Sequence, residues 1–118
     1  MFRFEKLAVW HRAVDYAEEV YMRTRSFPDD EKFGLTSQMR RAAVSVSSNI
    51  AEGSGRGSDK DFARFVELGY SSLMETVSQS HVVLRQRFLQ QQDMAHMRCT
   101  AVELARMLSG LKSSLLRN

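Results

Sequence analysis

Three side chains with metal-binding chemistry follow one another toward the C-terminal end of the sequence. His96, Cys99 and Glu103 recur at three- and four-residue steps, which places them on one face if the segment is helical. A tetrahedral zinc site needs four ligands, and no fourth ligand stands at a matching spacing. A di-iron bundle needs Glu-x-x-His on two helices, a motif that this sequence lacks. We therefore expect no metal site and no cofactor.

The sequence also gives little indication of nucleophilic catalysis. The serines lie outside any G-x-S-x-G elbow of the kind that exposes a catalytic hydroxyl. Cys99 stands among Met97, Ala101 and Val102, so we expect a buried, inert thiol. The residue types and spacings therefore predict that the protein is not an enzyme and has no catalytic residues.

The most unusual stretch is residues 40–62, "RRAAVSVSSNIAEGSGRGSDKDF", in which a helical pattern ends in glycines. Phosphate-binding glycine loops follow a strand, and the P-loop needs G-x-x-x-x-G-K-[ST]. Gly53, Gly55 and Gly57 follow a helix instead, and no lysine stands at the required position. We therefore interpret these glycines as a helix C-cap in the left-handed conformation, followed by a turn.

Residues that break helices are scarce: there is one proline, Pro28, and most of the six glycines lie at or between the ends of the expected elements. Apolar residues recur at three- and four-residue steps, which predicts helices over about 6–24, 31–52, 58–88 and 91–116. The apolar stripe of the first helix is expected at Leu7, Trp10, Val14, Ala17 and Tyr21. Four amphipathic helices with short connections favour an all-α, antiparallel up-down-up-down four-helix bundle, as a single domain over residues 1–118.

A strip of polar residues runs along the second helix, beside its apolar stripe. Polar groups next to a core are costly to bury unless each one finds a hydrogen-bond partner. We expect them to form a structural, hydrogen-bonded seam between the second and third helices; the alternative is that all of them face solvent. The predicted members of this seam are Ser45, Ser48, Asn49, Glu52, Ser72 and Glu75.

The charge is mildly basic, with a net value of +3 and a surplus toward the C-terminus, where residues 62–118 hold seven basic and four acidic side chains. This surplus permits a polyanionic partner, although ordinary solubility charge explains it equally well. The single cysteine, the absence of a signal-peptide pattern and the lack of an apolar run near ~20 residues predict a soluble, cytoplasmic protein with no membrane role.

Three blocks of the sequence resemble a known family in their order and spacing. These blocks are "FEKLAVWHRAVDYAEEVY", "FPDDEKFGLTSQMRRAAVSVSSNIAEGSGR" and "FVELGYSSLMET". Together they look like the bacterial four-helix bundle proteins, also called the 23S rRNA intervening-sequence proteins, over roughly residues 4–90. One departure is Ser71-Ser72, where the family usually has Gly-Ser, so slightly wider helix packing is expected there.

The resemblance implies a four-helix bundle, and it marks Arg41, Asn49, Glu52 and Arg56 as signature positions. Asn49 and Glu52 could serve the fold rather than function. Members of this family are similar to the accessory variability protein of diversity-generating retroelements. That relative forms a pentameric ring and binds RNA and a reverse transcriptase through basic surface, so the resemblance implies a homopentamer with such partners.

The basic surplus, the absence of catalytic spacing and the resemblance together predict a non-enzymatic, homo-oligomeric adapter that binds structured RNA. Its phosphate contacts are expected to position the RNA without reading bases. The alternative is a protein–protein scaffold without a nucleic-acid role, in which the methionines and the N-terminal aromatic residues form the binding surface. The candidate phosphate contacts are Arg41, Arg56, Lys60, Arg64, Arg85 and Arg87.

Overall fold

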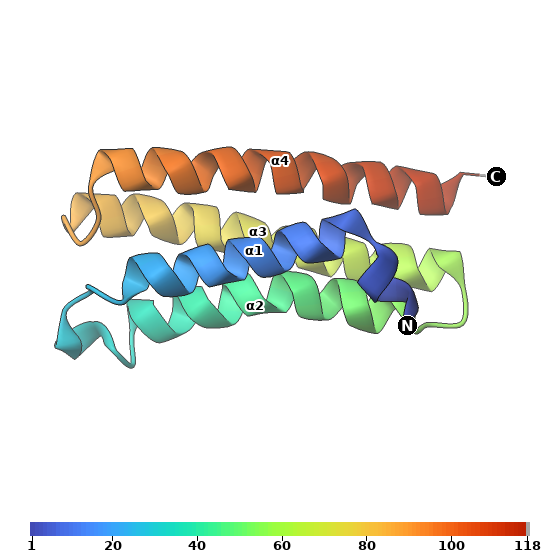
Figure 1. Ribbon diagram of the computed structural model, residues 1–118, viewed down its shortest axis with the longest axis horizontal. Helices are drawn as coiled ribbons and strands as arrows, with labels where there is room; N and C mark the ends of the chain where they lie inside the picture. The colour runs from blue at the N-terminus through green and yellow to red at the C-terminus, as the bar shows by residue number, and fades with distance from the viewer. Residues whose placement is uncertain (118) are drawn as a thin grey trace.

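The computed structural model describes residues 1–117 as four long helices that lie side by side in a bundle of 47 × 23 × 21 Å. Each helix runs opposite to the one before it, so the all-α, up-down-up-down prediction is confirmed (Figure 1). None of the helices described is long and apolar enough to cross a membrane. The helices are α1 (Ala8–Thr24), α2 (Leu35–Ser54), α3 (Asp59–Arg85) and α4 (Gln91–Leu116), with the 3₁₀ turns η1 (Arg3–Lys6) and η2 (Asp29–Glu31).

Three helix ends differ from the prediction for local reasons. α2 begins at Leu35 rather than near residue 31, because η2 and a turn come first, and Glu31 Oε1 accepts a hydrogen bond from the amide of Leu35 at 3.2 Å. α3 ends at Arg85 rather than near residue 88, since Arg87 adopts a left-handed backbone with φ of 63°. α1 starts at Ala8, after η1.

The core lies along the axis of the bundle and is built from apolar residues of all four helices. Apolar residues that recur at three- and four-residue steps in α2, α3 and α4, such as Met39, Leu73 and Leu104, are buried, but the buried face of α1 is rotated from the predicted stripe. Trp10 lies at the flank of the core with its ring 4.9 Å from that of Phe4, and Tyr21 is exposed with the guanidinium of Arg40 over its ring at 4.7 Å. The buried residues of α1 are Val9, Ala13, Tyr16, Ala17, Glu19, Val20 and Thr24.

The glycines after residue 52 do not end α2 in the way that the sequence suggests. Gly53 lies inside α2 and is buried against α3, where a Cβ would come within 2.6 Å of the Cβ of Phe65. Gly55 ends the helix with φ of −91°, and no glycine among residues 1–117 has a positive φ. The left-handed C-cap interpretation is therefore wrong, and Gly53 is needed for the close approach of two helices.

Candidate nucleic-acid interface

Three of the six candidate phosphate contacts lie at one end of the bundle. Arg56 stands in the turn between α2 and α3, and Lys60 and Arg64 follow on the first turns of α3. The C-terminal end of α4 reaches the same end (Figure 1), and Lys112 lines a shallow groove together with Lys60 and Arg64. We call Arg56, Lys60, Arg64 and Lys112 the basic end.

Two of these arginines converge on one carboxylate. Arg56 Nε donates a hydrogen bond of 2.6 Å to Asp61 Oδ2, and Arg64 Nε donates one of 3.0 Å to Asp61 Oδ1. These bonds, from Arg56 first and then Arg64, hold the pKa of Asp61 below its ordinary value. Asp61 therefore stays ionised, and its charge offsets part of the charge of the two arginines.

A buried aromatic ring supports the same pair of arginines. The guanidinium carbons of Arg56 and Arg64 lie 5.3 Å and 4.7 Å from the centre of the Phe65 ring. Such contacts fix the orientation of a guanidinium without using its N–H donors. Both arginines remain largely exposed, with 47% and 59% of their side-chain surface in solvent, so their outer donors stay available to a ligand.

Sequence reasoning missed two cations that the fold brings to this end. Lys112 of α4 joins the groove and pairs with Glu67 at 3.0 Å. Arg3 of η1 lies over the ring of Phe62 at 4.9 Å, with Asp59 at 3.9 Å. Neither residue carries a local signal of this role, because each reaches the basic end only through the packing of distant segments.

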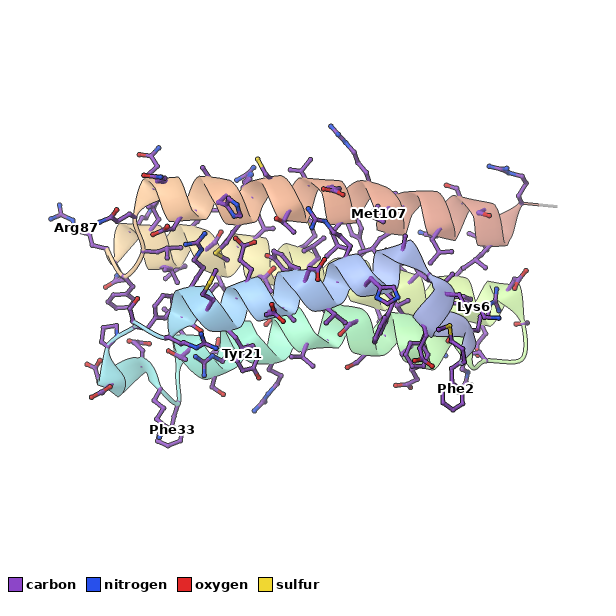
Figure 2. The ribbon with its side chains drawn as sticks, viewed as in Figure 1. Phe2, Lys6, Tyr21, Phe33, Arg87 and Met107 are labelled. Atoms are coloured by element: carbon purple, nitrogen blue, oxygen red, sulfur yellow. The ribbon has the colours of Figure 1, made fainter. Side chains whose placement is uncertain are left out.

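The other three candidates lie elsewhere. Arg85 and Arg87 stand at the opposite end of the molecule, and Figure 2 shows Arg87 there, far from Lys6. Lys60 and Arg85 are separated by about 38 Å along α3, at about 1.5 Å per residue. Arg41 is exposed near the start of α2. The structure therefore does not join the six candidates into one surface.

The predicted polar seam between α2 and α3 contains half of the expected residues. Ser45 Oγ and Ser72 Oγ share a hydrogen bond of 2.9 Å across the two helices. Asn49 Nδ2 donates to the Ser45 carbonyl at 2.8 Å and to its hydroxyl at 3.0 Å, which fixes the serine from within α2. Three predicted members are exposed and lie outside this seam: Ser48, Glu52 and Glu75.

A denser polar network, not foreseen from the sequence, joins α1 to α4. Glu19 is nearly buried between these helices, with Oε2 2.5 Å from His96 Nδ1 and 3.5 Å from Arg23 Nη2. Arg23 also reaches Asp93 at 3.0 Å. This network lies beside an open groove between the two helices that is lined by charged side chains of both.

The same groove holds the residues with metal-binding spacing. His96 faces Glu19, and Glu103 pairs with Arg12 at 2.9 Å. Cys99 is exposed, so the prediction of a buried thiol is wrong; its side chain lines the groove rather than the core. Among residues 1–117, no three His, Cys, Asp or Glu side chains are grouped to hold a metal ion.

Comparison with known proteins gives one family. The model of the family described as "23S rRNA-intervening sequence protein" matches residues 5–110, which is most of the chain and includes all of α1, α2 and α3. A search of curated proteins gives no match. The matched region contains the turn with Arg56 and the start of α3. This chain belongs to the 23S rRNA-intervening sequence protein family.

Proposed function

We propose that this protein is a non-enzymatic, homo-oligomeric adapter that binds structured RNA through its basic end. The observation that carries the proposal is the convergence of four cations at one end of the bundle: Arg56 in the turn between α2 and α3, Lys60 and Arg64 on α3, and Lys112 on α4. Exposed cations at this spacing suit a phosphate backbone, where they hold the nucleic acid in position without reading its bases. The family's description, which refers to 23S rRNA, supports RNA as the partner.

The non-enzymatic part of the proposal rests on the sequence, which offers no nucleophile elbow and no set of four metal ligands at a matching spacing. His11 Nε2 lies 2.7 Å from the carbonyl oxygen of Glu5, and His96 contacts Glu19. His81 Nε2 lies 3.2 Å from Arg98. Each imidazole therefore has one ring nitrogen in contact with another residue of the bundle.

The assembly and the cellular setting are proposed from the resemblance to the ring-forming accessory variability protein. A homopentamer is the expected assembly, the cytoplasm is the expected location, and a reverse transcriptase is a further expected partner. The exposed ring of Phe33, with 90% of its surface in solvent, is a candidate contact in such an assembly. Light scattering at micromolar concentration tests this part, and a monomer at every concentration contradicts it.

The test of RNA binding compares two triple variants with equal changes in net charge. Arg56→Gln, Lys60→Gln and Arg64→Gln are combined in one protein, and Arg41→Gln, Arg85→Gln and Arg87→Gln in the other. Binding of a fluorescent RNA hairpin is followed by anisotropy over a series of salt concentrations. We expect the first variant to bind more weakly and to lose about 0.7–0.9 of the log–log salt slope per phosphate contact removed, while the second stays close to the parent.

Equal affinities for the parent and the first variant would contradict RNA binding at the basic end. In that case a protein–protein scaffold is the better function, with the exposed N-terminal ring of Phe2 and the exposed methionines Met22 and Met74 as candidate contacts. A protein partner that still co-purifies from a nuclease-treated lysate supports the scaffold. Loss of every partner after nuclease treatment counts against it.

A further inference from the structure

The carboxylate of Asp61 lies between the guanidinium groups of two arginines, Arg56 and Arg64. Each of its oxygens accepts one guanidinium hydrogen bond, at 2.6 Å from Arg56 and 3.0 Å from Arg64. A phosphodiester offers the same charge of one and the same pair of acceptor oxygens. The geometry that holds the carboxylate is therefore also suited to a single backbone phosphate.

We propose that Arg56 and Arg64 form a phosphate-binding fork and that Asp61 is its internal competitor, which a phosphate of the ligand must displace. The inference deepens the proposed function and rests on it for the identity of the ligand, RNA. The fork itself is a property of this chain and is defined by the convergence of two arginines on one anion.

Asp61 is free to leave because the helix does not need its carboxylate. The N-terminus of α3 is capped by Ser58, whose Oγ accepts a hydrogen bond of 3.1 Å from the amide of Asp61. This bond uses the backbone of residue 61 rather than its side chain. Asp59, also in the first turn, supplies a second negative charge near the helix N-terminus. Swinging the Asp61 side chain away therefore leaves the cap in place.

The two arginines keep their orientation when the anion changes. Both guanidinium groups lie against the ring of Phe65, which is 7% exposed and fixed in the core. Their side chains do not have to be ordered when the ligand arrives, and a preorganised donor pair loses less entropy on binding. Lys60 stands one turn before Arg64, and Lys112 lines the groove beside both, so the neighbouring phosphates of a strand meet further cations.

The competition has a defined direction and size. Ion pairs between exposed side chains contribute little, so the Asp61 contacts lower phosphate affinity by a modest factor and do not block the fork. Removing the carboxylate should tighten phosphate binding by about two- to tenfold. A negative charge lost elsewhere on the same turn should change affinity by less than about twofold, because exposed charges are well screened at physiological salt.

The experiment compares Asp61→Asn with Asp59→Asn. Both variants remove one negative charge from the first turn of α3, but only Asp61 lies between Arg56 and Arg64. Asp59 instead lies 3.9 Å from Arg3, and both of those side chains are more than half exposed, so its loss releases no member of the fork. Inorganic tripolyphosphate is added to ¹⁵N-labelled protein, and the Nε–H resonances of Arg56 and Arg64 are followed by NMR. We expect half-saturation of these two resonances at about two- to tenfold lower tripolyphosphate concentration in Asp61→Asn than in the parent, with Asp59→Asn close to the parent.

A third protein links the effect to the fork. In the background of Arg56→Gln and Arg64→Gln, the substitution Asp61→Asn should no longer change tripolyphosphate binding, because the groups that it releases are gone. Binding to these two proteins, with and without Asp61→Asn, is followed by the backbone amide resonances of residues 56–64. Circular dichroism and urea unfolding check that every variant is folded. Equal half-saturation in Asp61→Asn and Asp59→Asn, or arginine resonances that do not respond to tripolyphosphate, overturns the inference.

The RNA hairpin separates this result from the proposed function. A hairpin that binds Asp61→Asn about two- to tenfold more tightly than Asp59→Asn supports both. A response to tripolyphosphate without any binding of the hairpin, even at low salt, keeps the phosphate fork and overturns RNA as its ligand. A hairpin that binds both variants equally well overturns the role of Asp61 as a competitor for RNA.

Discussion

The hydroxyl of Tyr16 on α1 lies 2.7 Å from Thr76 Oγ1 on α3, inside the core and between diagonally opposed helices. Both residues are essentially inaccessible to solvent. Thr76 Oγ1 also donates its one proton to the carbonyl of Leu73 at 2.7 Å, so Tyr16 must be the donor in the bond between the two hydroxyls. Removing the donor, Tyr16, and removing the acceptor, Thr76, should therefore lower the free energy of unfolding by different amounts.

The first prediction concerns this inequality. Tyr16→Phe removes the donor and leaves Thr76 bonded to Leu73, so we expect a loss of about 1 kcal/mol in the free energy of unfolding. Thr76→Val leaves the tyrosine hydroxyl buried without an acceptor, so we expect a loss of about 1–3 kcal/mol. The double variant should be no less stable than Thr76→Val alone. Urea unfolding measures all three, and a larger loss for Tyr16→Phe than for Thr76→Val would refute the donor assignment.

The second prediction is a pH dependence with a defined sign. Burial raises the pKa of Tyr16 above the ordinary tyrosine value. The neutral phenol is therefore favoured in the folded state. Its contribution is complete below the unfolded pKa of about 10 and is lost as the pH rises through the higher folded value. We expect the unfolding free energy to fall more steeply above about pH 10 in the parent than in Tyr16→Phe, as measured by urea unfolding at a series of pH values. Parallel curves would contradict this.

The third prediction tests the close approach of α2 and α3. A Cβ on Gly53 would lie 2.6 Å from the Cβ of Phe65 and 2.8 Å from Cδ1 of Phe62. The Phe65 atom is tied to the backbone of α3, so Gly53→Ala must push the helices apart, at a cost of about 1–3 kcal/mol. Gly110→Ala is the matched control, because within residues 1–117 no atom outside the neighbouring backbone of α4 lies within 4 Å of the added carbon. That variant should stabilise α4 by about 0.5–1 kcal/mol. If thermal unfolding shows both variants stabilised, the close approach at Gly53 is wrong.

The fold was predictable because it depends on patterns that each segment carries by itself. The periodicity of α2, α3 and α4 points directly at their buried residues, such as Met39, Leu73 and Leu104. The pattern of α1 is ambiguous because it has apolar residues on two adjoining faces. Which of the two faces is buried depends on the residues that pack against the other face. Trp10 packs against Phe4 of η1, and Tyr21 packs against Arg40 of α2.

The polar contacts were much less predictable. Some join residues that are distant in the sequence, and others depend on the direction in which a side chain points. The charge of Arg56 and Arg64 made both of them candidates, but nothing in the sequence indicates that both donate hydrogen bonds to Asp61. Glu19 and His96 are 77 positions apart, and each alone looks like an ordinary surface residue. The charged faces of different helices look alike in the sequence. Which charged residues form ion pairs is decided only by how the helices pack against one another.

The last prediction concerns Glu19 at the α1–α4 interface. Only 9% of its side-chain surface is exposed, and Oε2 lies 2.5 Å from His96 Nδ1 and 3.5 Å from Arg23. Glu19→Gln keeps the size of the side chain and removes the charge that both partners face. We expect a loss of about 1–3 kcal/mol in the free energy of unfolding, the range for hydrogen bonds to charged groups in partly buried sites.

The neighbouring Glu18 is exposed, so Glu18→Gln is the matched control and should change stability by less than about 0.5 kcal/mol. Urea unfolding measures both variants, and hydrogen exchange should show faster opening of α1 in Glu19→Gln alone, because this network joins α1 to α4. Equal stability of the two variants would mean that packing, rather than this network, holds the two helices together.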